Sequence, residues 1–256
     1  MKKIQFLALG VMSLPIMMSC EGMSQLAKTN ASNNTTIGST APSSSTGSIT
    51  QNEAITGIKQ ALNNGLQKSI TNLSAKDGFF GNQLVKILMP KEAQKVEQAL
   101  RAVGMGKLVD NFVLSLNRAA ESAVKEAAPV FVNSLSQMTL TDAFKILSGS
   151  QQDAATTFFK RTTSSALTEK FSPIVESALG SNNVSTYWTQ LTSAYNALPL
   201  SSSKIETDLN AYVTQKAIDG LFLQVAEEEL KIRDNIGGAR NSGILDKVFG
   251  WADSQK

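Results

Sequence analysis

Residues 203–234, SKIETDLNAYVTQKAIDGLFLQVAEEELKIRD, carry the helical pattern that decides the fold. Ser203 and Glu206 have the spacing of a capping box, in which two side chains bond the backbone at a helix start. The apolar positions that follow cover more than one helix face, which is typical of a central, largely buried helix. These positions are Leu209, Tyr212, Val213, Ala217, Ile218, Leu221, Phe222 and Val225. We therefore predict a buried helix from Ser203 to about Asp234.

The helical period continues through most of the chain after Ile49. An apolar stripe with spacings of three and four runs from Ile55 to Leu73, after a second capping box at Thr50 and Glu53. We also predict helices over residues 82–89, 91–103 and 107–128. Pro129 either kinks the last of these or starts a new one. No alternating stretch predicts a strand, so the expected fold class is all-α, with a single bundle-like domain over residues 49–256.

Composition excludes several classes of function. The chain has 256 residues, 42% of them hydrophobic, and no histidine, which rules out Ser-His-Asp triads, histidine metal sites and histidine acid–base catalysis. The single cysteine excludes an intrachain disulfide and a cysteine-cluster metal site. Oxygen ligands alone can hold calcium or magnesium, but no EF-hand spacing is present, so we predict no metal and no cofactor.

The N-terminus has the pattern of a bacterial lipoprotein signal. Lys2 and Lys3 precede an apolar run that is too short and interrupted to span a membrane, so we predict a signal peptide over residues 1–19. The small Ser19 before Cys20 resembles the lipobox, in which the cysteine is acylated. The alternative is an ordinary signal peptide with a chance cysteine. Two or three acyl chains would anchor the protein at a membrane far better than one.

Residues 20–48 are dominated by Ser, Thr, Asn and Gly and have almost no apolar side chains after the cysteine region. Such a segment cannot bury enough surface to offset its ordering entropy, so we predict a flexible tether. Glu21 is not the Asp that retains enterobacterial lipoproteins in the inner membrane. We therefore expect an outer-membrane protein facing the periplasm, with cell-surface exposure as the alternative.

Charge is nearly balanced. The formal net charge is +3, and without Lys2 and Lys3 of the signal peptide it falls to +1. A nucleic-acid partner is therefore not expected, because non-specific binders need a strongly basic face. The predicted partners are the membrane, through the lipid anchor, and an unknown protein or small molecule.

Several short motifs occur in an order that resembles the bacterial family named domain of unknown function 4197. They are Asn117-Arg118-Ala119-Ala120-Glu121, Met138-Thr139-Leu140-Thr141-Asp142-Ala143, Ile146-Leu147-Ser148-Gly149, Asp153-Ala154-Ala155-Thr156, Asp219-Gly220-Leu221-Phe222, Glu228-Glu229, Ile232-Arg233 and Val248-Phe249-Gly250. The resemblance covers residues 53 to 250. It implies an exported all-α domain and no particular activity.

The polar residues of these motifs form the candidate site: Asn117, Arg118, Glu121, Asp142 and Asp153. Arg118 and Glu121 are three residues apart on one helix and can pair directly. We favour a structural ion pair, in which Asp142 or Asp153 also reaches Arg118, over a grip on an anionic ligand. No catalytic residue is assigned.

Three further patterns have a structural interpretation that we prefer to a functional one. Asp142 and Asp153 each follow a Thr or Ser by three residues, so both fit capping boxes rather than a metal or acid–base site. The run Glu227–Glu229 fits a solvated helix face with favourable pairs to Lys231 and Arg233. Trp188 and Trp251 fit the core, although either could line a ligand pocket.

Ala128-Pro129-Val130-Phe131 and Ser172-Pro173-Ile174-Val175 repeat one pattern at an offset of 44 residues. Two proline-kinked helices of one bundle explain the repeat, and we favour them over an ancient duplication.

The leading functional hypothesis is a lipid-anchored envelope protein that binds or scaffolds without chemistry. The second is a periplasmic binder of a small ligand with an anion site near Arg118. The third is a hydrolase that uses carboxylates alone, which needs two acids facing one cleft at roughly 5–10 Å.

Overall fold

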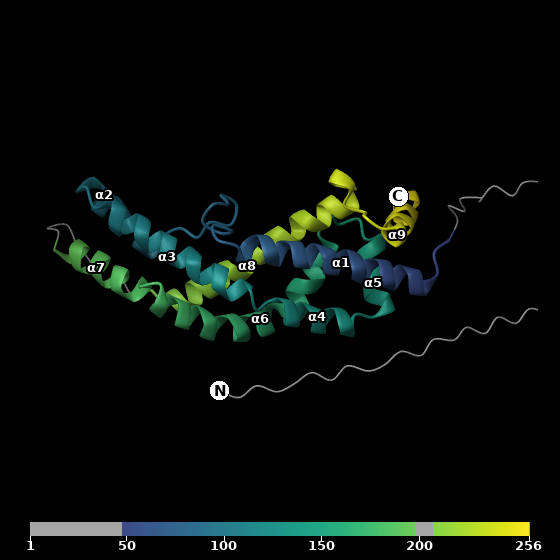
Figure 1. Ribbon diagram of the computed structural model, residues 1–256, viewed down its shortest axis with the longest axis horizontal. Coiled ribbons are helices and arrows are strands. Elements are labelled where there is room, and N and C mark those ends of the chain that lie inside the picture. The colour runs from purple at the N-terminus through teal and green to yellow at the C-terminus, as the bar shows by residue number, and fades with distance from the viewer. Residues whose placement is uncertain (1–47, 198–206, 256) are drawn as a thin grey trace, which may run out of the picture. The chain divides into compact units, whose positions relative to one another are not determined.

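The computed structural model describes residues 48–197 and 207–255. The predicted signal peptide, Cys20 and the tether up to residue 47 lie outside the described residues, as do Ser203 and Glu206. Every regular element in the described ranges is a helix, so the predicted all-α class is confirmed (Figure 1). None of the described helices is long and apolar enough to cross a membrane.

The first helix, α1 (Gln51–Ser74), forms as its sequence predicts. The Thr50 hydroxyl accepts a hydrogen bond from the Glu53 amide, and the Glu53 carboxylate accepts one from the Thr50 amide, which completes the capping box. The apolar stripe from Ile58 to Leu73 is buried. This stripe packs α1 against five of the helices that follow it in the chain.

The segment that follows α1 overturns one prediction. Residues 82–89 form turns and extended chain rather than a helix. The backbone of Ile87 bonds to the side chain of Asn117, and the Leu88 carbonyl accepts a hydrogen bond from the Tyr212 hydroxyl. These long-range partners take the place of the hydrogen bonds that a local helix would make.

The predicted helix over 91–103 is divided into a short 3₁₀ turn, η1 (Lys91–Ala93), and α2 (Gln94–Ala102). The predicted helix over 107–128 ends earlier than expected, and of the two alternatives for Pro129 the start of a new helix is confirmed. Here α3 (Gly106–Val124) ends before the chain restarts as α4 (Ala128–Gln137), with Pro129 in its first turn. A proline suits that position because the first turn has no helical acceptor for its missing amide hydrogen.

After α5 (Leu140–Ser148), the long α6 (Ala154–Ser181) packs alongside both α3 and α4 (Figure 1). Pro173 lies inside α6. Of the two prolines in the sequence repeat, one therefore starts a helix and the other lies within one. α7 (Val184–Asn196) then packs against α2 and α3.

The predicted central helix is α8 (Leu209–Arg233), which packs against α1, α3 and α6. Its predicted start was wrong. Asp208 is the residue that caps the helix, because its carboxylate accepts a hydrogen bond from the Ala211 amide. A short turn, η2 (Ile236–Gly238), leads to the last helix, α9 (Gly243–Ser254).

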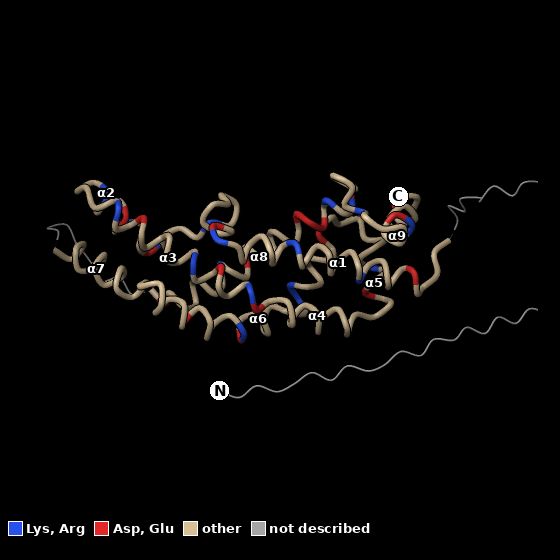
Figure 2. Tube along the Cα trace, in the orientation of Figure 1, with Lys and Arg blue, Asp and Glu red and all other residues tan. Residues whose placement is uncertain are grey.

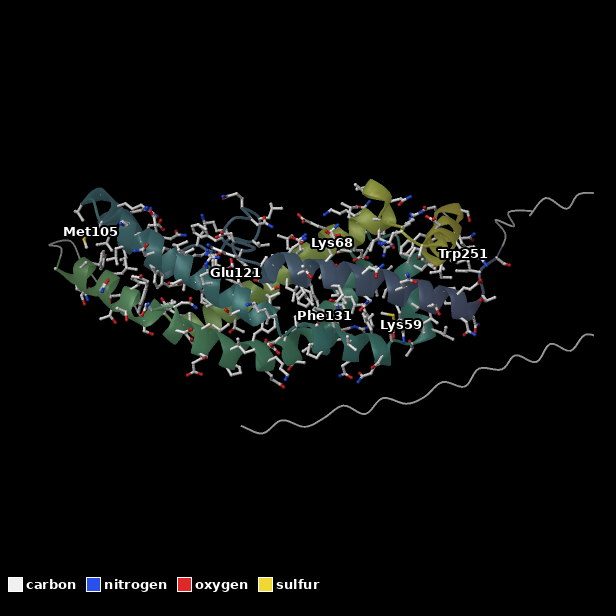
Figure 3. The ribbon with its side chains drawn as sticks, in the orientation of Figure 1. Lys59, Lys68, Met105, Glu121, Phe131 and Trp251 are labelled. Atoms are coloured by element: carbon white, nitrogen blue, oxygen red, sulfur yellow. The ribbon has the colours of Figure 1, made fainter. Side chains whose placement is uncertain are left out.

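Phenylalanine side chains join the helices at the centre of the core. Phe131 of α4 contacts Phe159 of α6 edge-on at a centroid distance of 5.2 Å, and Phe222 of α8 at 6.3 Å. Phe131 is 1% exposed and lies among the packed side chains of the bundle (Figure 3). At the edge of the core, Trp188 of α7 stacks on the buried Phe112. Trp188 and Trp251 are both partly buried and pack against the core, which agrees with the role predicted for them.

A glycine in α8 lets residues 75–90 lie directly on this helix. A Cβ atom at Gly220 would stand 2.7 Å from the Phe79 ring and 3.2 Å from the Val85 Cβ. Any larger side chain would push the segment away. This close approach brings the segment's backbone within reach of the polar residues of α3.

Candidate functional site

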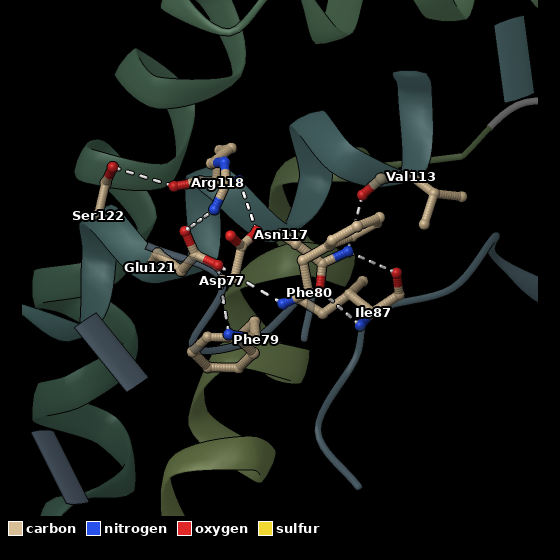
Figure 4. Close-up of polar contacts among 9 residues, drawn as sticks. All are labelled: Asp77, Phe79, Phe80, Ile87, Val113, Asn117, Arg118, Glu121 and Ser122. Carbon is tan, nitrogen blue, oxygen red and sulfur yellow. Dashed lines mark hydrogen bonds and ion pairs between the residues drawn. The ribbon is translucent and has the colours of Figure 1, made fainter. Parts of the chain in front are cut away.

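Asn117 is fully buried on α3 and clamps the extended segment. Its Oδ1 accepts a hydrogen bond from the Ile87 amide at 2.9 Å, and its Nδ2 donates to the Ile87 carbonyl at 2.8 Å (Figure 4). Nδ2 also donates to the Val113 carbonyl of its own helix at 2.7 Å. The Asn117 side chain thus bonds both backbone groups of Ile87, as a neighbouring β-strand would. These buried groups have no hydrogen-bond partner in a helix or a sheet, so Asn117 supplies it.

Glu121 performs a similar role one helical turn later. Its Oε1 accepts hydrogen bonds from the amides of Phe79 and Phe80, at 3.2 and 3.5 Å. Its Oε2 lies 2.6 Å from Nη1 of Arg118, so the predicted pair is confirmed (Figure 4). Because Glu121 is only 5% exposed, burying its carboxylate without these donors would cost free energy.

Arg118 has a second carboxylate partner that the sequence did not indicate. Its Nη2 lies 2.7 Å from Oδ1 of Asp77, a residue in the turn after α1 with a positive φ of 66°. Burial works to lower the pKa of Arg118, but the hydrogen bonds to Glu121 and Asp77 outweigh it and raise the pKa above its usual value. The guanidinium is therefore a permanent cation held between two carboxylates of the chain.

Asp142 and Asp153 take no part in this cluster. Asp142 accepts hydrogen bonds from the hydroxyl and amide of Thr139, so the predicted capping box at the start of α5 is confirmed. The Thr139 hydroxyl is the main cause of the lowered pKa of Asp142. Its cation neighbour is Arg161, at 3.7 Å, rather than Arg118.

The second predicted capping box, at Ser150 and Asp153, was wrong. α6 begins at Ala154, and Asp153 makes no side-chain capping bond. Glu229 of α8 caps the helix instead, because its carboxylate accepts hydrogen bonds from the amides of Ala155 and Thr156, both at 2.9 Å. A remote residue thus caps this helix, which sequence spacing cannot reveal.

The run Glu227–Glu229 is not the solvated face that its charge suggested. Glu228 and Glu229 are 3% and 6% exposed. Glu229 pairs with Arg233 at 2.8 Å, as predicted, and Lys231 pairs with Glu228 rather than with Glu227. The buried carboxylates of Glu228 and Glu229 thus connect α8 to α1 and α6.

Charges on the described helices are interspersed in sign along the chain (Figure 2). Among the described residues, no group of three or more His, Cys, Asp or Glu side chains is placed to hold a metal ion. The polar cluster on α3 has its hydrogen-bonding capacity taken up by the segment after α1, so its geometry serves folding.

The described part of the chain has a groove of about 850 Å³ where α4 and the end of α3 face α6. We call it the α4–α6 groove. Such a volume lies within the range of ligand sites, roughly 300–1,000 Å³. Its lining residues are Ser122, Glu126, Pro129, Val130, Asn133, Ser134, Gln137, Thr162, Ala166, Glu169, Lys170, Pro173 and Ile174.

A hydrogen bond of 2.8 Å between the hydroxyls of Ser134 and Thr162 joins the two walls of the groove. Thr162 donates its proton to the Phe158 carbonyl, so Ser134 is the donor in the joining bond. The two walls are therefore held at a fixed separation along this part of the groove. Both are built on helices, so the groove is formed before any partner arrives.

Sequence reasoning missed this groove, although one signal pointed to it. The repeated Pro129-Val130 and Pro173-Ile174 both lie in the lining. The repeat therefore supplies one apolar pair on each wall, Pro129-Val130 and Pro173-Ile174, which we call the apolar ledges. That the two ledges face one another depends on how α6 folds back along α4, which no local pattern shows.

The fold defines the described part of the chain as a helical domain without strands. The chain belongs to the family described as "Protein of unknown function (DUF4197)", whose sequence model matches residues 48–250. No curated protein and no solved structure matches the chain.

Proposed function

We propose that this is a lipid-anchored protein of the bacterial cell envelope whose helical domain binds another protein in the α4–α6 groove without catalysing a reaction. The groove is the observation that carries the proposal. It is preformed, it combines apolar ledges with hydroxyl and amide groups, and its volume suits a ligand.

The anchor in this proposal is supported by the sequence. The apolar run before Ser19 and Cys20 is typical of a lipoprotein signal, and Cys20 is the sole cysteine of the chain. With Glu21 next to it, the proposed location is the periplasmic face of the outer membrane. The domain would then meet its partner in the periplasm.

Neither alternative function is supported by the predicted site residues. An anion at Arg118 would have to displace Glu121 or Asp77, both already within 2.7 Å of the guanidinium. A carboxylate-only hydrolase needs two acids facing one cleft, and the acids that line the groove are Glu126 and Glu169 rather than any predicted candidate. Asp142 instead caps α5, and the acids of the α3 cluster bind backbone amides and Arg118.

Site-specific photocrosslinking of the full chain in the cells that produce it tests the proposal. A photoreactive amino acid replaces Ala166 or Asn133 in the groove, or, as controls, Val132 or Glu176 on the same two helices outside it. We expect an adduct of one defined protein at Ala166 and Asn133 only. Absence of adducts at the groove positions, or equal adducts at all four, would contradict the proposal.

A further inference from the structure

Pro173 leaves a backbone acceptor without its helical partner on the α6 wall of the groove. Proline has no amide hydrogen, so the carbonyl four residues earlier, that of Glu169, lacks the donor that a regular helix supplies. Glu169 and Pro173 both line the α4–α6 groove. A partner that presents N–H groups to this wall can complete the bond.

The α4 wall offers both a donor and an acceptor. Gln137 Nε2 donates to Asn133 Oδ1 at 3.3 Å. Among the described residues, this arrangement leaves Asn133 Nδ2 and Gln137 Oε1 without a hydrogen bond. A polypeptide backbone in extended form presents C=O and N–H groups in alternation, which matches such a pair.

The charged residues that line the groove favour a partner with a basic side chain. Glu126 and Glu169 lie on opposite walls, and Lys170 is the one cation in the lining. None of these three forms an ion pair within residues 48–197 and 207–255. The lining therefore carries a net negative charge, and a basic side chain placed between the two glutamates would have a carboxylate on each side.

We propose that the α4–α6 groove binds an extended polypeptide segment that carries a basic side chain between Glu126 and Glu169. This proposal rests on the proposed function and specifies the chemical character of the protein segment that binds in the groove. The apolar ledges at Pro129-Val130 and Pro173-Ile174 hold the neighbouring side chains of the segment. The Glu169 carbonyl and the Asn133–Gln137 pair hold its backbone.

Fluorescence anisotropy with the full chain in detergent tests this assignment. The probes are three labelled pools of short random peptides of equal length, one basic, one neutral and one acidic. We expect the basic pool to bind about tenfold more tightly than the acidic pool. Glu126→Gln combined with Glu169→Gln should remove this preference, whereas Glu176→Gln, an exposed acid of α6 outside the groove, should retain it.

Pro173→Ala tests the backbone contact separately. It restores the helical donor to the Glu169 carbonyl, so the affinity for the basic pool should fall although the folded protein is not weakened. Equal binding of the three pools, or an unchanged preference in the double glutamate variant, would overturn the proposal. If no pool binds while crosslinks at Ala166 persist, the peptide assignment is wrong and the proposed function stands. If those crosslinks fail too, both are wrong.

Discussion

Asn117 shows at the residue scale how one buried amide can stabilise a whole segment. Its three hydrogen bonds serve Ile87 and Val113, and its side chain is fully buried. Asn117→Ala would leave the amide and carbonyl of Ile87 without partners inside the protein. Each such group costs about 1–3 kcal/mol, so we expect a loss of about 3 kcal/mol in the free energy of unfolding.

Urea denaturation followed by circular dichroism measures this loss. Asn111→Ala, at a partly exposed position on the same helix, is the matched control and should change stability little. A loss below ~1 kcal/mol in Asn117→Ala would show that the clamp is not needed.

Arg118 and Glu121 form the ion pair most open to a quantitative test. Arg118→Met leaves the buried Glu121 carboxylate without its cation, which costs about 3–5 kcal/mol for a fully buried pair and less here because Arg118 is 24% exposed. Glu121→Gln in the same background should recover part of that loss. A double-mutant cycle should give a coupling energy of about 1–3 kcal/mol.

The exposed pair Arg101 and Asp110 is the control for this cycle. Its partners are 42% and 62% exposed at 2.7 Å, so its coupling should be about 0–1 kcal/mol. Equal coupling in the two cycles would contradict a structural role for Arg118 and return it to the candidates for ligand binding.

At the scale of helices, the two prolines of the groove should differ in their effects on stability. Pro173 removes a hydrogen bond inside α6, so Pro173→Ala should stabilise the protein, by up to about 3 kcal/mol. Pro129 lies in the first turn of α4, where no bond is lost, and Pro129→Ala should change little. Thermal unfolding checks both. A destabilised Pro173→Ala would mean that the proline is required for packing rather than for the groove.

The stability that the cap of α1 contributes should depend on pH. The hydrogen bond from Lys247, followed by those from Thr50, lowers the pKa of Glu53 from 4.5 to about 2. Because the folded pKa is depressed, the stability that Glu53 contributes is present above about pH 4.5 and is lost as the pH falls towards about 2. Wild type should therefore exceed Glu53→Gln in stability at neutral pH and approach it near pH 2. A difference that does not change with pH would contradict this assignment.

Local sequence predicts some elements and fails for others, for physical reasons. α1 is predictable because its cap and its apolar stripe lie within one continuous segment. Residues 82–89 mislead because their apolar spacing resembles a helix, whereas Asn117 and Tyr212 hold them extended from elsewhere in the chain. Glu228 and Glu229 mislead because a run of acids looks solvated, whereas Lys68 of α1 and the first amides of α6 also pair with them from other helices.

At the scale of the whole molecule, the sequence predicts one part of the candidate site, the cluster on α3, and misses its partner Asp77 and the groove. Asn117, Arg118 and Glu121 do gather, because helical spacing alone places them on neighbouring turns. Their partner Asp77 and the α4–α6 groove depend on which helices lie side by side, and that follows from packing of the full core.

The lipid anchor is a prediction at this same scale. Cys20→Ser should block acylation, so the protein should remain unprocessed or should leave the detergent phase in a Triton X-114 partition. Ser19→Ala keeps a small residue before the cysteine and should be anchored as wild type is. Processing of Cys20→Ser to the wild-type size together with unchanged partition would contradict a lipid anchor at that residue.

A variant that fills the α4–α6 groove shows whether a polypeptide binds there. Ala166→Trp places a large side chain in the groove, while Val132→Trp places the same side chain on α4 outside it. Each is combined with the photoreactive residue at position 133 in the full chain. We expect the adduct at position 133 to be lost in Ala166→Trp and retained in Val132→Trp. An adduct of equal yield in both variants would contradict binding in the groove.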